Sequence, residues 1–152
     1  MNLNVWVTSN KRFKYKEFFV SKKKPNYMDG VDIDCSIMDI IKLGVESVLD
    51  PIANAIAEEF SRKVPILISS GYRTPALNIS VGGSLTSDHV TANAVDYTID
   101  MSVIKSVELK DIVLERLPAL PFRQLISYNR KPHLHVAWNI PGKEYKREVF
   151  TL

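Results

Sequence analysis

The three histidines of this 152-residue sequence are the residues best suited to carry chemistry. They are His89, His133 and His135, all in the second half of the chain, and Asp96 follows the first of them by seven residues. Two imidazoles and one carboxylate form a ligand set that suits catalytic zinc, which keeps a fourth tetrahedral position open for water. Ordinary surface or hydrogen-bonded histidines are the alternative interpretation of the same spacing.

The sequence contains one cysteine, Cys35. A lone thiol cannot form an intrachain disulfide, and a zinc finger built on several cysteines is excluded. Any metal must therefore be held by histidine and carboxylate. We expect Cys35 to be a small apolar packing residue rather than a nucleophile.

Alternation along two predicted strands determines whether the candidate ligands can meet. In residues 94–99, every second side chain is apolar, and Asp96 lies on the opposite face. In residues 133–138, His133 and His135 share the face opposite the large apolar side chains. If the two strands belong to one sheet, Asp96 and His135 project from the same face. His89, in a Gly/Ser/Thr-rich loop, can fold back toward them.

Apolar periodicity predicts the elements that surround these strands. Residues 36–62 have the spacing of an amphipathic helix, with a kink or a restart at Pro51 because proline lacks an N–H. A second helix covers residues 102–117, with Ser102 or Ser106 as its cap. The other predicted elements are strands at Val64–Ser70, Gln124–Tyr128 and His133–Asn139 and a short helix at Thr74–Val81 that Thr74 caps.

Length and composition predict one folded domain. The chain is 45% hydrophobic and 24% charged, as in ordinary globular proteins. Helices precede most of the strands, so we expect an α+β domain whose antiparallel sheet is covered by helices on one face. Within residues 1–152 we expect a basic N-terminal segment (1–35), the long helix (36–62) and a core that holds the candidate metal ligands (64–139).

The net charge of +3 has a local origin. Seven of the 20 basic residues, but only one acid, Glu17, lie between Lys11 and Lys24. This segment could contact a polyanion such as an anionic lipid or an acidic wall polymer. The alternative is a solvated face around Phe13, Tyr15, Phe18 and Phe19. A general nucleic-acid binder would spread its basic charge more widely, so no nucleic acid is expected as a partner.

The chain shows no sign of a targeting or membrane segment. Residues 1–7 lack the apolar region of a secretory signal, and no stretch approaches the ~18 apolar residues of a membrane span. We expect synthesis in the cytoplasm without a signal peptide. If the target lies outside, another agent must release the protein or carry it there.

Two stretches resemble the zinc D-alanyl-D-alanine carboxypeptidase family, in particular its short phage-encoded branch. They are ISSGYRTPALNISVGGSLTSDHVTANAVD at 68–96 and HLHVAW at 133–138. The family pattern has Ser-Gly-Tyr-Arg, then Asn and Val-Gly-Gly, then Ser-x-His-x-x-Gly-x-Ala-x-Asp and a Trp-x-His-Val-type strand. The resemblance covers at least residues 64–139. It implies a hedgehog/DD-peptidase-like fold, one zinc ion per chain and hydrolysis of peptide stems of bacterial peptidoglycan.

Carried over by position, the resemblance also assigns roles to residues. It implies that the zinc ligands are His89, Asp96 and His135. It places Arg73 and Ser87 along the substrate groove, with Arg73 facing a carbonyl or carboxylate of the peptide, as its planar fork of donors allows. The alternatives are a structural hydrogen bond from Arg73 to loop carbonyls and an ordinary turn role for Ser87.

The sequence departs from the family pattern at two positions. The carboxylate that usually precedes the last ligand by three residues is replaced by Pro132. His133 lies on the same predicted face as His135, about 6 to 7 Å along the strand, and is our candidate for general base or transition-state stabiliser; Asp88 is a weaker one. The second departure is Ala92, where the family favours glycine; a positive φ there would cost an alanine free energy.

Three functions follow as hypotheses. The first is a zinc peptidase that acts on peptidoglycan stems, as a D,D-carboxypeptidase or as a lysin-like endopeptidase, encoded by a phage and acting on the host cell wall. The second is a catalytically weak or inactive zinc-holding module of the same fold that binds the wall or forms part of a virion. The third is a polyanion-binding protein that acts through residues 11–24.

Overall fold

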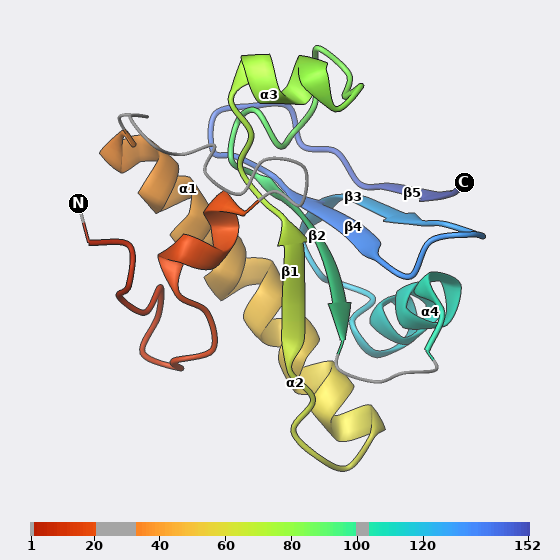
Figure 1. Cartoon of the computed structure of the whole chain (residues 1–152). Helices are drawn as coiled ribbons and strands as arrows, with labels where there is room; N and C mark the ends of the chain where they lie inside the picture. The colour runs from red at the N-terminus through yellow and green to blue at the C-terminus, as the bar shows by residue number, and fades with distance from the viewer. Residues whose placement is uncertain (1, 21–32, 100–103) are drawn as a thin grey trace.

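A five-stranded sheet and the helices packed against one face of it make up the molecule (Figure 1). This computed structural model describes residues 2–20, 33–99 and 104–152. The arrangement confirms the α+β class and the single layer of helices. No helix of the described residues is long and apolar enough to cross a membrane.

The long helix predicted over residues 36–62 is present as three consecutive segments. They are α1 (Cys35–Gly44), the π-helical turn η2 (Val45–Leu49) and α2 (Asp50–Glu59). The N–H of Asp50 donates to the carbonyl of Val45, one residue further back than in an α-helix. This change in winding directly precedes Pro51, which has no N–H to donate, so the predicted interruption is confirmed.

The sheet has the strand order β1-β2-β4-β3-β5. Its strands are β1 (Ile66–Ser70), β2 (Ala94–Ile99), β3 (Phe122–Ser127), β4 (Leu134–Trp138) and β5 (Glu148–Thr151). The first four pair antiparallel, as predicted. β5 was not predicted and runs parallel to β3, so the sheet is mostly rather than wholly antiparallel.

One face of the sheet forms the core, and the other carries the polar residues. Val95, Tyr97 and Leu134 are fully buried against the helices. Asp96 and His135 lie on the opposite face, as the alternation predicts. The short helix α3 (Pro75–Ser80) lies beyond one end of the sheet (Figure 1), and its predicted cap is confirmed because Thr74 accepts from the N–H of Leu77.

The N-terminal aromatic residues belong to the core. Phe13, Phe18 and Phe19 are buried, and the basic residues among them lie at the surface or contact neighbouring side chains. Arg12 forms an ion pair with Asp50 at 3.3 Å. Up to Val20, the solvated face around an aromatic cluster is therefore confirmed. Lys22, Lys23 and Lys24 lie outside the described residues, and polyanion contact stays a prediction.

Two predictions about single residues are wrong. Cys35 is exposed rather than packed, because it is the first residue of α1 and precedes the apolar stripe of that helix. Ser106 is not the cap of α4 (Ser106–Arg116) but its first residue; Lys105 holds the cap position, and its N–H donates to Glu108. The alternative cap, Ser102, lies outside the described residues.

The Ser106 side chain has a different structural role. Its hydroxyl, fully buried, donates to the carbonyl of His133 at 2.7 Å and accepts from the N–H of Tyr128 at 3.1 Å. These two residues flank the adjacent ends of β3 and β4. One side chain of α4 therefore joins the two strand ends and fixes the backbone that carries His133.

Replacing Ser106 by alanine should destabilise the protein. The change deletes the partner that two part-buried backbone groups share, and a lost partner costs a buried group about 1 to 3 kcal/mol. We expect the free energy of unfolding, measured by urea denaturation, to fall by at least about 1 kcal/mol. The matched control is Ser80→Ala, because Ser80 is exposed and bonds only within α3. Equal stabilities of the two variants would contradict the role of Ser106.

Candidate metal centre

Asp96 of β2 and His135 of β4 form the base of the site. The two residues are direct partners in the antiparallel pairing of these strands, so their side chains leave the same face of the sheet side by side. Nδ1 of His135 lies 2.8 Å from Oδ1 of Asp96. The juxtaposition predicted from alternation is confirmed.

His89 reaches the same point from the loop that follows α3. Its side chain is buried, and its Nε2 lies 3.4 Å from Oδ1 of Asp96. Nδ1 of His89 lies 2.7 Å from the carbonyl oxygen of Gly71. Because a carbonyl can only accept, Nδ1–H of His89 is the donor of this bond, and Nε2 is directed at Asp96. Such a backbone contact commonly orients a histidine that binds metal.

The loop that carries His89 has an unfavourable backbone conformation at Ala92. Ala92 has a φ of 61°, in the left-handed region that favours glycine, so the positive φ considered from the sequence is confirmed. The next residue, Asn93, is fixed to the end of β4: its carbonyl accepts from the N–H of Trp138, and its amide donates to the Trp138 carbonyl. The loop thus keeps its course despite the alanine.

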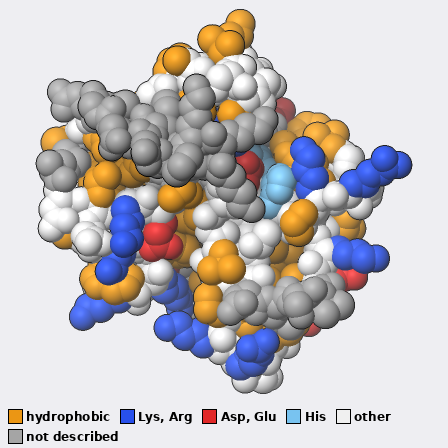
Figure 2. Space-filling model, viewed as in Figure 1, with side chains coloured by type: hydrophobic (Ala, Val, Ile, Leu, Met, Phe, Trp, Pro, Cys, Tyr) orange, Lys and Arg blue, Asp and Glu red, His pale blue; other side chains and the backbone are white. Residues whose placement is uncertain are grey.

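The three residues fit a zinc ion. One ligand atom from each of His89, Asp96 and His135 lies within 4.8 Å of the other two. The donors are two imidazole nitrogens and one carboxylate oxygen, the types that zinc accepts. Three protein ligands leave a fourth position for water or substrate, as in catalytic rather than structural zinc sites. Figure 2 shows histidine side chains in a hollow of the surface, beside an acidic side chain.

The Asp96 carboxylate is held in its charged form. Burial by itself would raise the pKa of Asp96, but hydrogen bonds from His135 and His89 and the charges of these rings outweigh it and keep the pKa far below its usual range. Arg73 adds an ion pair from Nη2 to Oδ2 at 3.1 Å. The carboxylate is therefore an anionic ligand at any physiological pH.

Arg73 and Ser87 both line the groove, and both also form hydrogen bonds within the protein. The Arg73 guanidinium donates to Asp96 and, through Nε and Nη2, to the hydroxyl of Ser70. The Ser87 hydroxyl accepts from the N–H of His89 at 3.4 Å, within the ligand loop. Both residues thus have a structural contact beside any role toward substrate.

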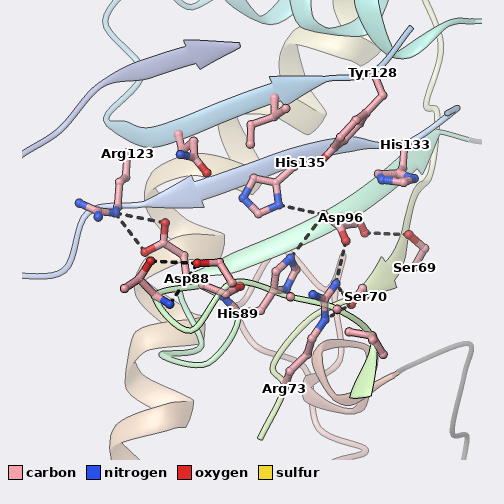
Figure 3. A pocket seen from close by; sticks show the side chains of 18 of the residues that line it. Ser69, Ser70, Arg73, Asp88, His89, Asp96, Arg123, Tyr128, His133 and His135 are labelled. Atoms are coloured by element: carbon pink, nitrogen blue, oxygen red, sulfur yellow. Dashed lines mark hydrogen bonds and ion pairs between the residues drawn. The ribbon is translucent and has the colours of Figure 1, made fainter. Parts of the chain in front are cut away.

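A groove of about 770 Å³ surrounds the ligands on the open face of the sheet. Figure 3 shows how its side chains gather around Asp96. Several lining residues were not singled out from the sequence, among them Ser69, Ser70, Tyr128, Arg123 and Glu148. A signal for Tyr128 exists: it continues the alternation that places residues 124 and 126 on this face. The pairing of β1 with β2 is irregular between Ile68 and Ser70, so Ser69 lies within this irregularity and Ser70 at its end, and no sequence pattern marks it.

The candidates for the missing carboxylate have different environments. His133 lines the groove near His135, and its ring lies 4.9 Å from that of Tyr128. The Asp88 carboxylate lies at 3.0 and 3.2 Å from Nε of Arg123 and also accepts from Asn93. This carboxylate is already paired, so the geometry favours His133. Among the described groove residues, the only other carboxylates are Asp96 and Glu148.

Comparison with known proteins identifies the family of this chain. The family model described as Peptidase M15 matches residues 11–137. A search of curated proteins returns no match. The matched region covers most of the chain and contains His89, Asp96 and His135 together with the groove residues other than Lys146 and Glu148. The protein therefore belongs to the peptidase M15 family, the zinc D-alanyl-D-alanine carboxypeptidase family that its motifs resemble.

Proposed function

We propose that this chain is a zinc-dependent peptidase that hydrolyses the peptide stems of bacterial peptidoglycan. The observation that carries the proposal is the His89–Asp96–His135 cluster at the floor of an open groove, in a chain that belongs to a family of zinc peptidases. When zinc is bound, it supplies a Lewis acid that polarises a carbonyl and lowers the pKa of a water molecule to about 7.

In this proposal His133 transfers the proton, and Arg73 and Ser87 bind the peptide. His133 accepts a proton from the attacking water, in place of the carboxylate that Pro132 lacks, and returns it to the leaving nitrogen. Arg73 orients a carbonyl or carboxylate of the peptide while it stays paired with Asp96. Ser87, on the loop side, contacts the peptide backbone along the groove.

The shape of the groove supports an endopeptidase. A second hollow of about 400 Å³ adjoins the first one, and the two share Thr86, Ser87, Asp88, Arg123 and Lys146 as lining residues. A substrate chain can thus continue past the Asp88–Arg123 pair instead of ending near the metal centre. A D,D-carboxypeptidase needs only a short pocket for one terminal residue. We therefore favour cleavage within a stem or cross-link, as a phage-encoded lysin would perform it.

One observation favours a second candidate function. Pro132 occupies the position of the expected carboxylate, and the Asp88 carboxylate is paired with Arg123. A zinc-holding module that binds wall material without turnover, for example as part of a virion, has the same ligands and the same groove. The two functions differ in hydrolysis alone.

Replacing Asp96 by asparagine should remove zinc and hydrolysis together. The change deletes the only anionic ligand, whereas Asp39→Asn, on an exposed position of α1, is a matched control with the same chemistry. We expect about one zinc per chain in the wild-type and control proteins by elemental analysis, and at least about tenfold weaker zinc binding by Asp96→Asn. Mass spectrometry of digested muropeptides should show products with the first two proteins only.

Intact muropeptides after incubation with fully zinc-loaded wild-type protein would exclude the peptidase. Wall binding without turnover would then support the second candidate function. A wild-type protein that retains no zinc in the presence of excess metal would exclude both.

Replacing His133 by glutamine should separate zinc binding from catalysis. Loss of a positioned proton acceptor typically costs about 10² to 10⁴ in rate, so we expect kcat to fall by at least about a hundredfold at unchanged zinc content. The complementary variant His133→Gln with Pro132→Asp should recover part of the rate, because it restores the carboxylate of the family pattern. A His133→Gln protein with wild-type kcat would show that another group accepts the proton.

A further inference from the structure

We propose that Tyr128 is a catalytic residue whose hydroxyl donates a hydrogen bond to the oxyanion that forms when water attacks the scissile carbonyl. The proposal rests on the peptidase function proposed above. It adds a residue that neither the sequence motifs nor the ligand geometry assigns.

The position of Tyr128 follows from the pairing of β3 with β4. Ile126 of β3 is the direct partner of His135. Tyr128 is two residues further along, so it lies on the same face, beside His133, as the ring separation of 4.9 Å confirms. In Figure 3 the Tyr128 side chain extends from the end of β3 toward the His135–Asp96 pair. Tyr128 lines the same groove as His89, Asp96 and His135.

The surroundings of Tyr128 hold the ring in this place. Its backbone N–H is fixed by the buried hydroxyl of Ser106, which also fixes the carbonyl of His133. The Lys131 ammonium lies 4.5 Å from the centre of the Tyr128 ring, and the His133 ring packs beside it. A donor held before the reaction begins loses little free energy to reorganisation, which is what makes such donors effective.

Arg73, the other donor of the site, has contacts within the protein and in the proposed function orients a carbonyl or carboxylate of the peptide, so Tyr128 is an additional donor. Nε and Nη2 of Arg73 donate to Ser70 and Asp96. Burial raises the pKa of the Tyr128 phenol, and the Asp96 charge raises it further, while Arg73 partly opposes this. The phenol is therefore protonated at neutral pH and can donate.

The chemical step balances without a change in the protonation of Tyr128. Water forms a bond to the carbonyl carbon and loses a proton to His133, while the π electron pair of the carbonyl moves onto its oxygen. The Tyr128 O–H donates to that oxygen and keeps its proton. The pair then returns, the C–N bond breaks, and the nitrogen takes the proton from His133. The negative charge on the oxygen is larger in the transition state than in the substrate, so the Tyr128 hydrogen bond stabilises the transition state more and raises the rate.

The test compares zinc-loaded wild-type protein with Tyr128→Phe, which deletes only the hydroxyl. Tyr145→Phe is the matched control, because Tyr145 is 61% exposed and does not line the groove. Two quantities are measured: kcat and KM on a stem peptide, and the affinity for a phosphinate analogue of the scissile bond by calorimetry. The phosphinate presents anionic oxygens on a tetrahedral centre and so resembles the oxyanion.

For Tyr128→Phe we expect kcat to fall by at least about tenfold. Removing one donor from a fully enclosed oxyanion hole costs about 10² to 10³ in kcat, and we expect a smaller loss here because the groove is open. Phosphinate affinity should fall by a similar factor, with KM and zinc content unchanged. A merely structural role would instead alter zinc content or KM. Wild-type values of both kcat and phosphinate affinity would overturn the proposal. If the wild-type protein hydrolyses no stem, the peptidase function fails, and equal phosphinate affinities of the two proteins overturn the role of Tyr128 independently.

Discussion

The pairing register between β2 and β4 is the constraint on which the site depends. It sets Asp96 opposite His135 on one face of the sheet and Val95 opposite Val136 on the other. A slip by one residue would turn every side chain of a strand to the opposite face, so it would bury the carboxylate in the core and expose the apolar side chains. The hydrophobic burial of Val95, Tyr97 and Val136, all fully buried, therefore holds two candidate metal ligands together.

The third candidate ligand, His89, lies on a loop whose backbone conformation is energetically unfavourable at Ala92. A left-handed conformation costs an L-residue about 1 to 2 kcal/mol, and Ala92 adopts it directly after the His89 turn. The paired hydrogen bonds of Asn93 with Trp138 attach the far end of the loop to the sheet, and the Gly71 carbonyl holds the His89 ring itself. The departure from glycine at Ala92 thus affects stability while the ligand keeps its place.

The sequence predicts the features that depend on local periodicity. Alternation identified the shared face of Asp96 and His135, and Pro51 and Thr74 marked the helix interruption and the helix cap. The parallel strand β5 was missed because its pairing with β3 is non-local and its four residues have no buried alternate face. The groove residues on β3 were not singled out for a different reason: alternation shows that they share a face with His135, but it does not show which of them line the groove.

Two different parts of the fold hold the candidate metal ligands and the groups proposed to act on substrate. The ligands depend on β2, β4 and the loop after α3, whereas Tyr128 and His133 depend on the strand ends that Ser106 of α4 joins. The carboxylate of the family pattern can therefore give way to Pro132 without disturbing the metal centre. Its loss also changes the charge of the site.

With Asp88 paired to Arg123, Asp96 is the only carboxylate at the centre among the residues that the structure describes, and it is paired with Arg73. A bound zinc ion would leave this region with a net positive charge. That charge favours the developing oxyanion and the carboxylates of a peptide stem. A histidine in place of a carboxylate base therefore removes one negative charge from the site and strengthens the attraction between the site and negative charge.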